Sequence, residues 1–391
     1  MPNTIVSTGK TRHLTYQELD ILHSLRGFCA FYVVIYHAKY VLWSGGQQYL
    51  QKFPRISWDI NKYILFALDM LSSAGFEMVI FFFVLSGFFI RYAQLRKHRD
   101  LLEFYLNRIV RIYPPYLVSV GLAALTLIVL STHAPQAVSD KINRELNISL
   151  ATAWYELRHL NVFGIIKTLF FMPVQKMYVG YNHVFWSLLP EALFYLLVPI
   201  VFIRIKAYYI ISIIAYVVGL VLQQQQIGLN AILNYLLIYN MYFAVGAMLY
   251  DVVVNMDLIK LVKKVPAWIL FTAVIFLFLV LIGLAIVKLR YISGIVASLL
   301  AILCISTLLA DKVSSKNILI KLMHAIGIFS FSLYLYHLPL LLICYGLLVI
   351  ITGDFVFYDR YYWLAVPLVT LACYGLYWIT ERVSVNYFRK V

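Results

Sequence analysis

The chain has 391 residues, of which 63% are hydrophobic and only 13% are charged. Because a soluble domain has about 25% charged residues, this composition excludes a soluble globular protein and indicates a chain that crosses a membrane several times. The formal net charge of +15 does not indicate nucleic-acid binding, because the basic residues are scattered through the predicted loops. We expect membrane lipids, and no nucleic acid, among its partners.

Ten stretches of the sequence are long and apolar enough to span a bilayer, which takes roughly 17 to 25 residues each. They lie near 21–42, 74–95, 112–130, 183–203, 207–222, 229–250, 266–287, 291–310, 324–351 and 361–381. The predicted fold class is all-α, a polytopic bundle of about ten transmembrane helices. Residues 1–19 hold no apolar run typical of a signal peptide, so we expect the first helix to be retained.

The predicted organisation is a short segment at 1–19, one membrane domain at 20–382 and a short tail at 383–391. An even number of spans places both termini on the same side of the membrane. Most of the 32 lysines and arginines fall on that side, and the positive-inside rule then makes it the cytoplasm. The two long loops, 43–73 and 131–182, are expected outside.

Within the second loop, a mostly apolar segment at 162–172 is too short to span the membrane. We expect it to lie in the interface or to re-enter the bilayer, and to end at Pro173. The four cysteines lie in apolar segments without the spacing of metal ligands, which predicts packing roles and no metal site. They are Cys29, Cys304, Cys344 and Cys373.

The first span carries an arginine at its start and a histidine deep inside it. Arg26 and His37 are eleven residues apart, so at about 100° per residue they share nearly one helix face, about 16 Å apart along the axis. An ionisable group in the middle of a membrane is costly and marks a candidate functional site. The pattern indicates a basic group at the membrane surface aligned with a proton-handling group in the bilayer.

A pair of arginines precedes the third span. Arg108 and Arg111 are helix neighbours at i and i+3. Pro114 and Pro115 suit the first turn of the next helix, where a missing N–H costs nothing. Two guanidinium groups side by side are suited to binding phosphates. The alternative is contact with lipid headgroups, and we favour the phosphate ligand for this pair.

The fourth span places Ser187, Glu191 and Tyr195 on one helix face at i and i+4 spacing. Pro190 removes a helix hydrogen bond, so we expect a kink near the carboxylate. At about 1.5 Å per residue, Glu191 lies about 12 Å below the outer edge of the membrane. It is either a functional acid or a structural group paired with a histidine or a tyrosine, and the sequence favours neither.

The ninth span carries Tyr334, Tyr336 and His337. Counted from the cytoplasmic ends of their helices, His337 lies about 20 Å and His37 about 24 Å into the membrane. Glu191 descends from the other side of a hydrocarbon core ~30 Å thick, so the three groups fall at a comparable depth. Three titratable side chains at one level are hard to explain by packing, and we predict that they belong to one functional site.

Five blocks of the sequence resemble the acyltransferase-3 family of integral membrane O-acyltransferases, in the family's order and over nearly the whole chain. The blocks are Leu25-Arg26-Gly27 with His37, Phe82-Phe83 with Ser86-Gly87-Phe88, Arg108-x-x-Arg111 with Pro114 and Tyr116, Trp186-Ser187 with Glu191 and Tyr195, and Ser332-x-Tyr334 with His337 and Pro339. We expect a bare membrane domain, without the SGNH-type domain that some members carry.

The resemblance implies transfer of an acyl group, usually acetyl from cytoplasmic acetyl-CoA, to a hydroxyl of a carbohydrate outside a bacterial inner membrane. The acceptor would be a surface polysaccharide or a lipid-linked glycan such as lipopolysaccharide. The implied site residues are Arg26, Arg108 and Arg111 for CoA; His37, Glu191 and His337 for catalysis; and Ser187, Tyr195, Tyr334 and Tyr336 for substrate binding. His37 would be the general base or a transient acyl carrier.

The main alternative is a transporter, proton-coupled or exporting a glycan, because intramembrane histidine and glutamate also form proton relays. Against it, the sequence shows no repeated halves or paired broken helices. A structural scaffold ranks third, because it has no use for buried ionisable groups. The sequence leaves open the acceptor sugar and its hydroxyl, the acyl chain, the choice between base and carrier, and the oligomeric state.

Overall fold

The computed structural model describes residues 14–96, 100–256 and 258–389. In these residues the chain is helical without strands, and nine helical stretches are long and apolar enough to cross a membrane. The protein is a multi-pass membrane protein, as its sequence predicts. The ten predicted spans are all helical. They form nine stretches because His183–Gln224 holds two of them, and the chain leaves the helical conformation between these two at Arg204.

The predicted spans correspond to α2 (His23–Leu42), α5 (Gly75–Arg96), α6 (Leu101–His133), α9 (Leu188–Val201), α10 (Ile205–Gln224), α12 (Asn240–Asn255), α14 (Ala267–Ile286), α15 (Arg290–Leu309), α17 (Ser330–Thr352) and α18 (Tyr362–Ile379). Shorter helices are α1 (Tyr16–Asp20), α3 (Gly46–Lys52), α4 (Ile60–Leu71), α7 (Glu145–Arg158), α8 (Val162–Leu169), α11 (Ala231–Asn234), α13 (Leu258–Lys264), α16 (Ile318–Ile328) and α19 (Glu381–Arg389). Turns of 3-10 helix lie at Arg55–Ser57, Pro135–Val138, Val179–Tyr181, His183–Ser187 and Phe202–Arg204, and a π-helical turn at Tyr235–Tyr239.

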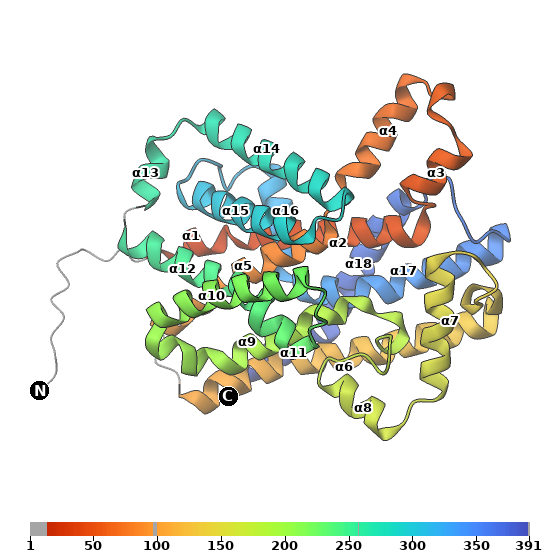
Figure 1. The fold of residues 1–391 in the computed structure, drawn as a ribbon, viewed down its shortest axis with the longest axis horizontal. Coiled ribbons are helices and arrows are strands. Elements are labelled where there is room, and N and C mark those ends of the chain that lie inside the picture. The colour runs from red at the N-terminus through yellow and green to blue at the C-terminus, as the bar shows by residue number, and fades with distance from the viewer. Residues whose placement is uncertain (1–13, 97–99, 257, 390–391) are drawn as a thin grey trace, which may run out of the picture.

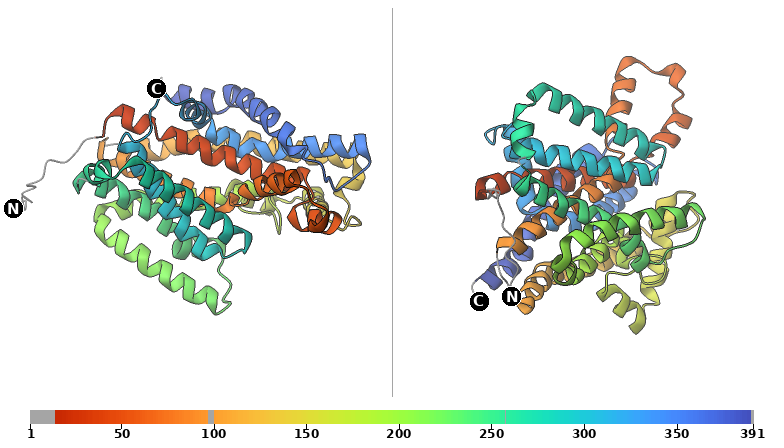
Figure 2. Two further views of the ribbon diagram at one scale, coloured as in Figure 1. Left: turned by 90° about the horizontal axis from the view of Figure 1, so that it is seen from above. Right: turned by 60° about the vertical axis from the view of Figure 1, so that its left-hand side comes forward.

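The two ends of the bundle carry different short helices (Figure 1). α1 and α13 lie at one end, and α3, α4, α7 and α8 lie in the opposite half of the molecule, with α8 below α6. Because the last four belong to the predicted external loops 43–73 and 131–182, both loops are largely folded. A second view shows most of the spans side by side along the longest axis (Figure 2).

α8 covers most of the segment that was expected to lie in the interface or to re-enter the bilayer. Its eight residues are too few to cross a bilayer. The Asn161 side chain accepts a hydrogen bond from the backbone N–H of Gly164 at 2.9 Å and so begins the helix. Phe163 and Ile166 are exposed. An amphipathic helix at a membrane surface has such an apolar face, and both positions expected for this segment, interfacial and re-entrant, remain predictions.

α5 and α12 pack closely because two glycines lie in their interface. A Cβ atom on Gly87 would lie 2.0 Å from the carbonyl oxygen of Phe243, and one on Gly246 would lie 1.9 Å from that of Val84. Small residues let helix backbones approach in this way. α5 also packs against α2, which in turn contacts α16, α17 and α18. The first span is therefore central in the bundle.

Pro114 and Pro115 lie inside α6, which runs through them, so the prediction that they begin a helix was wrong. The helix is anchored on both sides of the prolines. Before them, the Tyr105 hydroxyl donates to Leu196 O at 2.9 Å; after them, the Tyr116 hydroxyl donates to a backbone carbonyl at 2.6 Å. Packing of both halves therefore outweighs the lost backbone hydrogen bonds.

Two other helix boundaries differ from the prediction. Pro190 lies in the first turn of α9, after a 3-10 turn. No N–H is needed at that position, so a helix starts there instead of kinking. The predicted span at 324–351 is divided at Phe329 into α16 and α17, and α17 continues through Pro339.

Candidate active site

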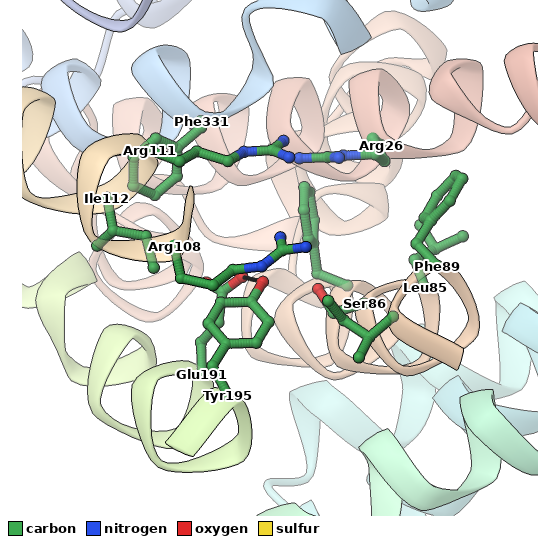
Figure 3. Close-up of a pocket in the computed structure, with 12 residues that line it drawn as sticks. Arg26, Leu85, Ser86, Phe89, Arg108, Arg111, Ile112, Glu191, Tyr195 and Phe331 are labelled. Atoms are coloured by element: carbon green, nitrogen blue, oxygen red, sulfur yellow. Dashed lines mark hydrogen bonds between the residues drawn. The ribbon is translucent and has the colours of Figure 1, made fainter. Parts of the chain in front are cut away.

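Three arginines from two helices line one cavity inside the bundle (Figure 3). Arg26 comes from α2, Arg108 and Arg111 come from α6, and Glu191 of α9 is the carboxylate among the described residues of the lining. The cavity has a volume of about 70 Å³. With three guanidinium groups against one carboxylate its walls are positively charged, and such a cavity between low-dielectric walls attracts anions.

Two of these guanidinium groups face each other. Arg26 and Arg111 extend toward one another from opposite walls (Figure 3). The Arg26 guanidinium lies 5.4 Å from the centre of the Phe82 ring, and its Nε atom is buried without a hydrogen-bond partner among the described residues. A buried donor without a partner costs free energy and the two like charges repel, so a bound anion would stabilise the arrangement.

Glu191 is held on the arginine side of the site. The hydroxyl of Tyr195, one turn later in α9, donates a hydrogen bond to Glu191 Oε1. The Arg108 guanidinium lies 5.0 Å from the centre of the Tyr195 ring. The pairing of Glu191 with a tyrosine, one of the two alternatives left by the sequence, is therefore present. The catalytic role of Glu191 remains a prediction.

Three cavities follow one another through the bundle. A wide cavity of about 640 Å³ lies among α1, α6 and α19 and shares Arg108 and Arg111 with the arginine cavity. A narrow cavity of about 30 Å³ lies among α2, α5, α9 and α17. The arginine cavity shares four lining residues with it, namely Phe82, Ser86, Glu191 and Phe331. The three cavities are therefore neighbours in a row from the surface beside α1 and α19 into the centre of the bundle.

The narrow cavity ends beside two hydroxyl groups. Ser187 Oγ and the Tyr334 hydroxyl lie 2.7 Å apart, and each is within hydrogen-bonding distance of the same carbonyl oxygen, that of Val184, at 3.2 and 3.0 Å. The Tyr334 ring centre lies 6.1 Å from that of His337. Val33, which also lines this cavity, precedes His37 by one helical turn. The row of cavities therefore reaches the level of both predicted histidines.

His37 and His337 form a direct pair. Nδ1 of His37 lies 2.9 Å from Nε2 of His337, and the rings are stacked with their centres 5.0 Å apart. His337 is completely buried, whereas His37 is half-buried. The prediction that these residues share one level in the membrane places them correctly relative to each other, and the structure adds that they touch.

The backbone determines the tautomers of the neutral pair. Nδ1 of His337 lies 2.9 Å from Leu333 O, and because a carbonyl only accepts, Nδ1 must carry the hydrogen. Nε2 of His337 is then an acceptor, so Nδ1 of His37 is the donor across the 2.9 Å contact. No hydrogen bond from another described residue reaches Nε2 of His37, which therefore keeps a free lone pair. That atom can accept a proton or attack a carbonyl carbon.

Tyr336 does not face the cavities. Its hydroxyl donates to Pro115 O and contacts Thr380 Oγ1, both at 3.0 Å, and its side chain is completely buried. Two residues correspond to about 200° around a helix, so Tyr336 and Tyr334 necessarily point in nearly opposite directions. The substrate-binding role predicted for Tyr336 therefore gains no support from its position.

Sequence reasoning missed a buried contact that ties the second external loop to α17. Pro339 has no N–H, so it leaves the carbonyl of Leu335 without its helix donor. Asn182 Nδ2 donates to that oxygen at 3.0 Å, and Ser119 Oγ donates to it at 2.7 Å. The two side chains also contact each other at 3.3 Å. The signal in the sequence was the proline two residues after His337.

Comparison with known proteins identifies one family. The family model described as an acyltransferase domain, that of the acyltransferase-3 family, matches residues 19–382. No curated protein and no solved structure matches the chain. The matched range includes both histidines and the three arginines of the cavity.

Proposed function

The chain belongs to the acyltransferase-3 family, and from that premise we propose that it transfers an acetyl group from acetyl-CoA to a hydroxyl of a surface or lipid-linked glycan. It is a membrane acyltransferase by its family; the donor, the acceptor and the O-acetyl product are the proposal. The observation that carries the proposal is the row of neighbouring cavities from three arginines to Val33 and Tyr334, one turn before each member of the histidine pair.

The arginines provide the binding site for the anionic part of the donor. Guanidinium groups bind phosphates in a bidentate manner, and CoA carries phosphates at the end remote from its thioester. The wide cavity of about 640 Å³ receives the nucleotide, with Arg108 and Arg111 at its inner end. The unpartnered Nε of Arg26 gains a hydrogen-bond partner when the donor binds.

The pantetheine arm follows the narrow cavity toward the histidines. At about 30 Å³ this cavity holds roughly one water-sized group, so its lining side chains must move apart when the arm binds. Rotamer changes of this kind are common on ligand binding. The thioester then lies beside Nε2 of His37.

The chemistry uses the lone pair of His37. Nε2 takes the proton of the acceptor hydroxyl while the hydroxyl oxygen attacks the thioester carbon. The tetrahedral intermediate collapses with cleavage of the C–S bond, and the same proton passes from His37 to the CoA sulfur. The products are the glycan ester and free CoA. His337 orients the His37 ring and stabilises its protonated form, as the acceptor for the hydrogen on Nδ1.

Ser187 and Tyr334 are suited to stabilising the oxygen of the thioester. Both hydroxyls share one carbonyl acceptor, Val184 O, so one hydroxyl hydrogen can turn to another oxygen at small cost. A donor placed where negative charge develops lowers the barrier of acyl transfer. Of the two, Tyr334 is the nearer to His337, because Tyr334 lies one turn before His337 on α17.

We place the wide cavity at the cytoplasmic face of the membrane. Most basic residues lie near that end of the spans, as the positive-inside rule requires for the cytoplasm. The opposite end, with α3, α4, α7 and α8, then faces outward, and the glycan reaches His37 from there. In a bacterium this is the inner membrane.

The test uses the full-length protein purified in detergent, with acetyl-CoA labelled in the acetyl group and the glycan extracted from the host's own membranes. We expect label in the glycan with the wild type and none with His37→Ala. Because the native glycan is the acceptor, absence of transfer by the wild type would overturn the proposed function. Comparing the mass of the glycan with and without this gene then identifies the acceptor and the acyl group.

A further inference from the structure

A turn of the second external loop lies against the histidine pair. We call residues 178–183 the loop strap. Its end is fixed by Asn182, which is completely buried and donates to Leu335 O at 3.0 Å. Because Leu335 lies between Tyr334 and His337 on α17, the strap is attached at the level of the histidine pair.

The backbone of the strap adopts a sparsely populated conformation. Gly180 and Tyr181 are consecutive residues with φ of 63°. A Cβ on Gly180 would lie 2.2 Å from the backbone of Ala123, so the backbone at Gly180 packs directly against the backbone of α6. A positive φ at a non-glycine residue is unfavourable and is retained where surrounding contacts demand it. Here it directs the Tyr181 side chain toward α2.

Tyr181 connects the strap to the helix that carries His37. Its hydroxyl lies 3.3 Å from that of Tyr40, which follows His37 by three residues and so lies on the same side of α2. The Tyr181 ring meets the ring of His183 edge to face at 4.4 Å. Burial raises the pKa of Tyr181 well above its ordinary value, so this phenol is a neutral hydrogen-bond donor.

His183 has ring nitrogens available to a ligand. It is half-buried, its ring contacts that of Tyr181, and neither of its nitrogens makes a hydrogen bond to another described residue. The narrow cavity is lined by Val33, one turn before His37, whereas Tyr40 lies one turn after His37. Through Tyr181, His183 is therefore linked to the turn of α2 that follows His37.

We propose that His183, together with Tyr40 and Tyr181, binds the hydroxyl-bearing acceptor, a carbohydrate, beside Nε2 of His37. This inference rests on the proposed function, because it assigns the acceptor side of the same reaction. Imidazole and phenol groups donate and accept hydrogen bonds, and their rings offer apolar faces to a sugar. The donor reaches His37 from one side and the acceptor from the other, so the two substrates do not compete for one route.

The test separates the two substrates kinetically. Purified wild type, His183→Ala and Tyr40→Phe are assayed with acetyl-CoA and host membrane glycan, titrated by its total hexose content. Release of CoA in the absence of glycan measures reaction with water, which needs no carbohydrate site. The matched control is His159→Ala, an exposed histidine of the same loop whose Nδ1 bonds to its own helix.

We expect His183→Ala to raise the KM for glycan about tenfold, as the loss of one or two hydrogen bonds predicts, and Tyr40→Phe to raise it less. In both variants the KM for acetyl-CoA and the release of CoA without glycan stay at their wild-type values. The control His159→Ala behaves like the wild type in every assay. An unchanged KM for glycan in both variants overturns this inference, and so does an equal loss of all activities. A wild type that transfers nothing to the glycan overturns the proposed function first.

Discussion

Nδ1 of His37 and Nε2 of His337 lie 2.9 Å apart, although the two residues are 300 positions apart in the sequence. The contact joins the first and ninth predicted spans inside the bundle. Because Nδ1 of His337 bonds to the backbone at Leu333, the hydrogen bond between the rings runs from His37 to His337. The free nitrogen of His37 therefore depends on a residue that need not touch either substrate.

Because the two histidines act as a pair, we predict that the losses in kcat caused by replacing each of them are strongly non-additive. His37→Ala should lower kcat by about 10² to 10⁴, the usual contribution of a general base. His337→Ala should lower kcat by about 10 to 100, because the His37 ring loses its orientation, and the double variant should be no worse than His37→Ala. The measurement is kcat for transfer of labelled acetyl to the glycan. Additive losses would show that His337 acts independently of His37.

The arginine cavity predicts a defect in donor binding that depends on the phosphates. Arg111→Ala should raise the KM for acetyl-CoA roughly 10- to 100-fold, the cost of a charged hydrogen bond. Acetyl-pantetheine, which lacks the nucleotide and its phosphates, should be used equally by the variant and the wild type. Arg204→Ala, an exposed arginine outside the cavities, serves as the control. An equal defect with both donors would assign Arg111 to structure instead of phosphate binding.

Because the arginine cavity and the narrow cavity share part of their lining, a bulky side chain placed there should block the passage of the donor. Ser86 lines both, so Ser86→Trp should fill the connection and abolish transfer, with release of CoA lost as well, because the thioester no longer reaches His37. Leu347→Trp places the same ring on an exposed position of α17 and should leave activity unchanged. Full activity of Ser86→Trp, with normal expression and thermal unfolding, would rule out this path for the donor.

The contact between the loop strap and α17 predicts a loss of stability together with activity. Asn182→Ala removes a donor to the carbonyl that Pro339 leaves unpaired, and should lower the free energy of unfolding by about 1–3 kcal/mol. Thermal unfolding in detergent measures the change. Asn143→Ala, at an exposed position of the same loop, should unfold like the wild type. An unchanged unfolding temperature for Asn182→Ala would mean that water replaces the amide.

The lone pair on His37 predicts a direct transfer without an acyl-enzyme. When the enzyme is mixed with acetyl-CoA in the absence of glycan and quenched within milliseconds, intact mass measurement should find no acetylated protein. The free nitrogen is also a competent nucleophile. Acetyl bound to His37 in an amount equal to the enzyme would therefore identify the histidine as an acyl carrier and replace the mechanism of direct transfer.

Several features of the site follow from the sequence because they depend on one helix at a time. The alignment of Arg26 with His37, and the neighbouring positions of Arg108 and Arg111, result from a rise of 1.5 Å and a turn of 100° per residue. The pairing of Glu191 with Tyr195 is likewise local, at i and i+4. Pro339 exposes a carbonyl four residues earlier by the same rule.

Contacts between helices do not follow from such rules. The depth of a side chain is set by its place along a helix, but its neighbour depends on how each helix is rotated and which helices are adjacent. Depth alone grouped Glu191 with His37 and His337, whereas the structure places Glu191 with the arginines and pairs the histidines. Pro114 and Pro115 were assigned to a helix start for a similar reason. The contacts that keep α6 helical on both sides of them are made with other elements, which the local sequence does not reveal.

The sequence by itself determined the number and order of the spans, the family, and the two groups of charged residues at different depths, because hydropathy and helical periodicity are local properties. Only the tertiary structure decided that His37 contacts His337, that neighbouring cavities extend from the arginines to Val33 and Tyr334, and that the loop strap packs Tyr181 against Tyr40 and His183. These contacts join segments up to 300 residues apart, and only the packing of all the helices together brings them into register.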